Sequence, residues 1–115
     1  MIKYNEWGNH LRLGNWLFLY SGLSSISKQS NNGVVFPNHS MWNYFENPPF
    51  ITDNKEYDEL FHFKPEPYSE KLKKEYIEYF RGNQTKIINV NLGSHLQSEK
   101  WFIEDIDYIK NLLTI

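Results

Sequence analysis

The amino-acid sequence predicts a single α/β domain over residues 1–115, with a parallel sheet and flanking helices. Segments with helical spacing of apolar residues alternate along the chain with short apolar runs typical of buried strands. A chain of 115 residues with 40% hydrophobic and 23% charged residues has the size and composition of one globular domain. We therefore expect one hydrophobic core of moderate size.

The N-terminal third predicts a strand, a helix and a second strand. Residues 1–4 could supply a short first strand, and a helix is expected from about Asn15 to Ser27. The apolar residues at helical spacing are Trp16, Leu19, Tyr20, Leu23 and Ile26. Leu17 and Phe18 widen this stripe, so the helix should be buried on most sides. Residues 30–33 then predict a turn, and Val34-Val35-Phe36 a short buried strand that Pro37 ends.

The middle of the chain predicts an irregular excursion followed by a helix. Residues 38–67 contain four prolines among aromatic and acidic residues, and we expect a surface segment with one short helix at most. From Ser69 to Arg81 the apolar residues again fall on one helical face, with Ser69 placed to cap the helix and Gly82-Asn83 to end it.

The C-terminal third predicts a strand and a last helix. Residues 86–92 alternate, and Ile88, Val90 and Leu92 form an apolar face. Residues 101–113 carry an apolar helical stripe, with acidic residues early and Lys110 late, as the helix dipole favours. The alternation of helix and strand predicts a Rossmann-like half with helices packed on the sheet.

Composition excludes several functional classes. The net charge of −2 gives no general attraction to nucleic acid, and no apolar stretch approaches the length of a membrane-spanning helix. The N-terminus lacks the apolar region of a signal peptide, so we expect a cytoplasmic protein. Without cysteine there is no disulfide or thiolate chemistry, and the four histidines lack metal-ligand spacing, so no metal site is expected.

The segment Arg12-Leu13-Gly14-Asn15 stands directly before the first predicted helix. A cation and backbone N–H groups at a helix N-terminus favour anions, so this is a candidate phosphate or sugar site. Gly14 lets the backbone approach a ligand closely, and Asn15 could either cap its helix or bind the ligand. Arg12 is one of only two arginines, and it could equally cap a helix or lie on the surface.

This segment, extended to Arg12-Leu13-Gly14-Asn15-x-x-Phe18-x-Tyr20, resembles the opening signature of the family 11 glycosyltransferases, the α-1,2-fucosyltransferases. Residues 92–102 resemble a later motif of the same family and match it at Leu92, Gln97, Ser98 and Phe102. The chain departs from that family at Trp16, where members usually carry Gln, and at Leu11, where they carry Gly. It also departs at Ser94-His95-Leu96, where members carry Gly-Tyr-Phe.

The resemblance implies one half of a GT-B-type enzyme that, when complete, transfers fucose from GDP-fucose to a galactoside without an obligatory metal. It covers nearly the whole chain but only the N-terminal part of the family's catalytic domain. The family's His-x-Arg-Arg motif, which grips the diphosphate, is absent, because the only other arginine is Arg81. We therefore expect a truncated or split enzyme that is inactive alone, with a complementing C-terminal domain as partner. The alternative is a non-catalytic glycan-binding or protein-interaction domain.

The resemblance implies donor-binding roles for Arg12, Gly14 and Asn15 and leaves the catalytic base unassigned. The loop after the strand at residues 86–92 is where α/β folds place ligands, and the acceptor side would contain His95, Gln97 and Ser98. Gln97 and Ser98 offer neutral hydrogen-bonding groups suited to sugar hydroxyls, and His95 could donate, accept or act as a base. A structural role for His95 and a helix-capping role for Ser98 are the competing interpretations.

Overall fold

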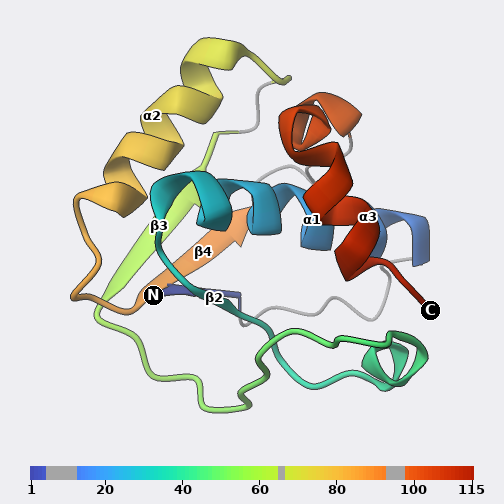
Figure 1. Ribbon diagram of the computed structural model, residues 1–115. Coiled ribbons are helices and arrows are strands. Elements are labelled where there is room, and N and C mark those ends of the chain that lie inside the picture. Colours follow the sequence, from blue (N-terminus) through green and yellow to red (C-terminus); the bar gives the residue numbers. More distant parts are fainter. Residues whose placement is uncertain (5–12, 65–66, 93–97) are drawn as a thin grey trace.

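The computed structural model describes residues 1–4, 13–64, 67–92 and 98–115 (Figure 1). It contains a four-stranded sheet in which every neighbouring pair is parallel, in the order β2-β1-β4-β3. The strands are β1 (Ile2–Lys3), β2 (Val34–Val35), β3 (Glu59–Phe63) and β4 (Ile88–Leu92). At the centre of the sheet Ile2 of β1 is opposite Ile88 of β4. The predicted α/β fold with a parallel sheet is therefore confirmed.

The three α-helices lie on one side of this sheet (Figure 1). They are α1 (Leu13–Ser30), α2 (Glu70–Arg81) and α3 (Ile106–Leu112). The units β1-α1-β2 and β3-α2-β4 advance in the same direction across the sheet, so right-handed crossovers place both helices on one face. In the connection from β2 to β3, the carbonyl of Glu56 accepts a hydrogen bond from Lys3 Nζ at 2.8 Å.

Helix α1 forms the centre of the core, as its wide apolar stripe predicts. It packs against α2, α3 and the sheet, and Leu19, Leu23 and Ile26 are completely buried. A cluster of rings fills the space between α1 and the segment after β2: Tyr20 packs edge-on against Phe36 at 5.3 Å and against Trp42 at 5.0 Å between ring centroids. Most of the large aromatic content therefore supports the core.

Helix α2 follows its sequence signals closely. Ser69 is the N-cap, and its Oγ accepts from the Leu72 N–H at 3.0 Å. Gly82 is the C-cap, and its N–H donates to the Glu78 carbonyl, so the helix ends where Gly82-Asn83 predicts. Phe80 is completely buried beneath it against β3 and β4.

Two elements differ from the sequence-based expectation. Strand β3 lies inside the segment predicted to be irregular, although the expected short helix is present as the 3-10 helix η1 (Ser40–Tyr44). The last helix is also shorter than residues 101–113, because its start is replaced by two 3-10 turns, η2 (Glu99–Trp101) and η3 (Ile103–Asp105). Within the described residues, no helix is both long and apolar enough to span a membrane.

Candidate functional site

The two motif segments both leave the carboxyl edge of the sheet from neighbouring strands. From Leu13 onwards the first motif lies in the first turns of α1, the helix that follows β1, and the second motif begins at Leu92, the last residue of β4, which is the strand paired with β1. Arg12, His95 and Gln97 lie outside the described residues. Gly14 and Asn15 lie in the first turn of α1, which begins at Leu13, two residues earlier than expected. Asn15 is therefore inside the helix and is not its N-cap.

Ser98 is the one predicted acceptor-side residue whose side chain is described. It is the N-cap of η2, and its Oγ accepts from the Lys100 N–H at 3.3 Å. Its side chain is half-buried. This hydrogen bond matches the capping interpretation, in which Ser98 positions the turn that follows the second motif.

The described parts of the two motifs contact each other. Phe18, from the first motif, packs against Phe102, from the second, with ring centroids 5.9 Å apart and planes inclined at 50°. The neighbouring Trp101 is buried and stacks nearly parallel to Tyr76 of α2 at 6.0 Å. The second motif therefore packs against both α1 and α2, and Phe18 and Phe102, 84 positions apart in the sequence, lie side by side.

Other first-motif side chains lie in the core. Trp16 is buried, with its ring 4.5 Å from that of His39 and 6.0 Å from that of Trp42. The Nδ1 atom of His39 accepts from the Met41 N–H at 3.0 Å and so begins η1. Among the described residues, no group of three or more His, Asp or Glu side chains is arranged to hold a metal ion.

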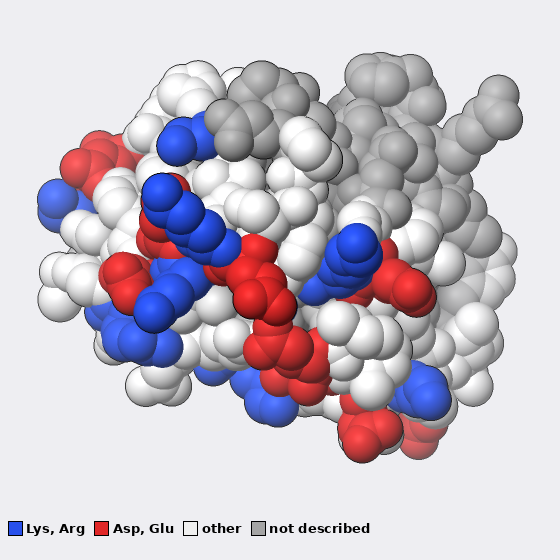
Figure 2. Space-filling model, turned by 90° about the horizontal axis from the view of Figure 1, so that it is seen from above, with Lys and Arg blue, Asp and Glu red and all other residues white. Residues whose placement is uncertain are grey.

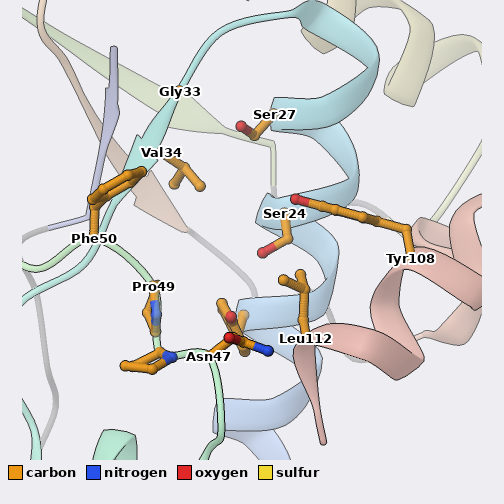
Figure 3. Close-up of a pocket in the computed structure, with 11 residues that line it drawn as sticks. Ser24, Ser27, Gly33, Val34, Asn47, Pro49, Phe50, Tyr108 and Leu112 are labelled. Atoms are coloured by element: carbon orange, nitrogen blue, oxygen red, sulfur yellow. The ribbon is translucent and has the colours of Figure 1, made fainter.

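A pocket of about 380 Å³ lies on the other side of α1 from the α2 contact, between α1, the start of β2, residues 47–50 and α3. Figure 3 shows Val34, Pro49 and Phe50 on one side of this pocket and Tyr108 and Leu112 on the other. Ser24 and Ser27 of α1 form the wall between them. None of the described residues that line it is Asp, Glu, Lys or Arg, so its walls are neutral.

Tyr20, the last residue of the first motif, also lines this pocket. The residue is 1% exposed, and its hydroxyl has no hydrogen-bond partner in the described part of the chain. Burial and, to a smaller extent, the nearby Tyr108 raise the pKa of Tyr20 to about 12, so the phenol stays protonated at neutral pH. Sequence reasoning treated Tyr20 as an aromatic core residue. Ser24 and Ser27, within an apolar helix, are the signal that could have indicated a polar pocket there.

A second, more open groove of about 430 Å³ lies between α1, α2 and η3. Its lining contains both signs of charge, with the basic residues Lys73, Lys74 and Arg81 and the acidic residues Glu70, Glu78 and Glu104. Figure 2 shows basic and acidic side chains together on the visible face, with a short run of acidic side chains near its centre and basic side chains on either side. This groove therefore lacks the uniform charge that attracts a highly charged ligand.

Behind this groove a buried polar network joins α1, α2 and η3. Lys73 Nζ donates to Ser25 Oγ at 3.0 Å, and Ser25 Oγ donates to Asp105 Oδ2 at 2.6 Å. Gln29 Nε2 donates to the same carboxylate oxygen at 2.7 Å. Ser25 is fully buried and Lys73 is 2% exposed, so this network is inaccessible to a substrate and acts as a structural link.

Comparison of the chain with family models, with curated proteins and with solved structures found no match.

Proposed function

We propose that this chain is a truncated or split piece of a family 11-like glycosyltransferase, corresponding to the N-terminal half of a GT-B catalytic domain and contributing part of the donor site. The observation that carries the proposal is the contact between Phe18 and Phe102, because it joins two motifs that the resemblance relates to one catalytic domain. The parallel pairing of β1 with β4 is consistent with it, since ligands of α/β sheets bind beyond the carboxyl ends of the strands.

In this proposal the nucleotide sugar GDP-fucose lies beyond the carboxyl edge, with its diphosphate near the N-terminus of α1. Arg12 supplies the cation, Gly14 permits close approach of the backbone, and Asn15 contacts the donor. His95 and Gln97 face the galactoside acceptor, and Ser98 shapes the turn behind them. Because the chain lacks the His-x-Arg-Arg motif, transfer requires a complementing domain that provides those arginines.

Calorimetry with GDP-fucose tests the donor-binding part of the proposal, and the two arginines of the chain provide a matched pair of variants. We expect Arg12→Ala to weaken binding about tenfold or more, because a charge-assisted contact to phosphate is lost. Arg81→Ala should bind as the unmodified protein does. Arg81 lies at the end of α2, where it donates to the Gln29 carbonyl at 2.9 Å.

Two calorimetric results would contradict the donor-binding proposal. No heat at millimolar GDP-fucose, with the fold shown to be intact by circular dichroism, rules out independent donor binding. Equal losses from Arg12→Ala and Arg81→Ala would show that Arg12 has no specific role in holding the phosphate.

A further inference from the structure

We propose that the neutral pocket between α1, β2, residues 47–50 and α3 is a binding site for an uncharged sugar ring. The site shares Tyr20 with the first motif, but the rest of its lining on α1 and β2 comes from Ser24, Ser27, Gly33 and Val34, away from Gly14 and Asn15. It therefore does not depend on the proposed donor site. Its volume of about 380 Å³ lies within the range of small-molecule sites, roughly 300–1,000 Å³.

The buried hydroxyl of Tyr20 is the first observation in support. A buried polar group without a partner costs free energy, and a ligand that enters the pocket and displaces the side chains covering the Tyr20 hydroxyl would recover that cost by supplying the missing hydrogen bond. Ser24 Oγ points into the same space from the next turn of α1 (Figure 3). Ser27 Oγ already donates to the Asn32 carbonyl, at 2.5 Å, and so offers a ligand only its lone pairs. One wall of the pocket is thus a row of hydroxyl groups.

The opposite wall is the second observation. Phe50 is 82% exposed at the edge of the pocket, although its carbonyl is held by the Phe36 N–H at 3.0 Å. An exposed ring on an anchored backbone, next to Pro49, forms an apolar platform that loses no backbone freedom when a ligand covers it. A sugar ring has both features that these walls require, since its hydroxyl edge can face α1 while its C–H face packs on Phe50.

The absence of charged side chains among the described lining residues of the pocket favours neutral ligands over charged ones. Since none of the described lining residues carries a charge, a sugar acid or a sugar phosphate would lose hydration without gaining an ion pair. Lys28 Nζ lies 5.0 Å from the centre of the Tyr108 ring, but Lys28 itself is not among the lining residues. A purely apolar ligand would leave the Tyr20 hydroxyl without a partner. The pocket therefore favours neutral, hydroxylated rings.

Titrations followed by amide NMR test the proposal with methyl α-glucoside, methyl β-galactoside and methyl α-mannoside as probes. We expect at least one of them to cause saturable shifts at Ser24, Val34, Phe50 and Tyr108. Glucuronic acid and benzyl alcohol, which have the wrong charge and the wrong polarity, should bind at least tenfold more weakly. No saturable shift with any pyranoside at tens of millimolar, or equal binding of glucuronic acid or benzyl alcohol, overturns the assignment.

Tyr20→Phe removes only the hydroxyl and tests its role directly. We expect it to weaken the pyranoside about twofold to tenfold, the range for one hydrogen bond. Tyr57→Phe is the matched control, because Tyr57 is 46% exposed and does not line the pocket. Ser24→Ala is a second variant that keeps the test open should Tyr20→Phe fail to fold. Unchanged affinity in both pocket variants overturns the proposal.

Discussion

Replacing Asp105 with Asn should destabilise the protein strongly, although the two side chains have almost the same size. Asp105 lies in η3 and its side chain is only 10% exposed. Its carboxylate accepts from Ser25 Oγ at 2.6 Å, from Gln29 Nε2 at 2.7 Å and from Lys28 Nζ at 3.2 Å. All three donors belong to α1, so this one carboxylate holds η3, and the α3 helix that follows it, against α1.

The magnitude follows from the nature of these contacts. Hydrogen bonds to a charged group contribute about 1.5–3 kcal/mol each, whereas an ion pair with the half-exposed Lys28 contributes about 1 kcal/mol or less. An Asn side chain keeps one oxygen for either Ser25 or Gln29, but its amide group then faces the remaining donors. We therefore expect Asp105→Asn to lower the free energy of unfolding by about 2–3 kcal/mol at pH 7.

The loss should depend on pH in a defined direction. Burial raises the pKa of Asp105, but hydrogen bonds from Gln29, Ser25 and Lys28 outweigh burial, so the pKa lies below its ordinary value of 3.8. The folded state then binds this proton less readily than the unfolded state. The stabilisation is present above the unfolded pKa and is lost as the pH falls through the lower, folded pKa. The difference between the two proteins should accordingly shrink in acid.

Urea unfolding followed by circular dichroism, at pH 7 and below pH 3.8, measures both effects. Asp107→Asn is the control, because Asp107 is an exposed residue in the first turn of α3 and should change stability by about 0.5 kcal/mol or less. An equal loss in the two variants, or a loss for Asp105→Asn that is the same in acid, would refute the reasoning.

Two further substitutions test neighbouring features. Burial lowers the pKa of Lys73 more than Glu104 and Asp105 raise it, so Lys73→Met should leave stability at pH 7 unchanged or higher. The stability of Lys73→Met relative to the unmodified protein should decline as the pH rises towards 10.5, because the folded unmodified protein loses the proton of Lys73 at a lower pH than the unfolded chain does. Urea unfolding at pH 7 and pH 10 measures this difference, and an increase in the relative stability of Lys73→Met at pH 10 would contradict the prediction. Ser69→Ala removes the cap that binds the Leu72 N–H and should lower the free energy of unfolding by about 1 kcal/mol, whereas Ser69→Asp, which can cap equally well, should not.

The elements predicted correctly from sequence are those in which local signals agree with the packing. Helix α2 has an N-cap, an apolar face and an end signal, and the structure uses all three. Strand β4 alternates, and its Ile88 and Val90 are completely buried. The fold class followed from the order of such elements along the chain.

The elements that sequence missed are decided by distant contacts. In β3 the inward residues Phe61 and Phe63 alternate with His62, but neighbouring prolines and charged residues hide the pattern. The strand is fixed by pairing with β4, 25 or more positions away. The 3-10 turns before α3 likewise depend on Asp105, whose donors all belong to α1. No local pattern contains that information.

The two candidate sites were predictable from sequence to different degrees, because one depends on the order of elements along the chain and the other on distant contacts. Order along the chain and parallel topology are enough to bring both motif segments to one sheet edge, and the contact between Phe18 and Phe102 agrees with that expectation. The neutral pocket depends on how residues 47–50 and α3 fold back against α1, which sequence alone does not specify.

The Asp105 network links the second motif to the neutral pocket. The chain runs from Phe102 through η3 directly into α3, and α3 supplies Tyr108 and Leu112 to the pocket wall. Three donors on α1 hold Asp105, three residues before Tyr108, so α3 has a fixed position relative to Ser24. Helix α1 thus contributes to both candidate sites: its first turns contain the motif that contacts Phe102, and its later turns supply serine hydroxyls to the pocket.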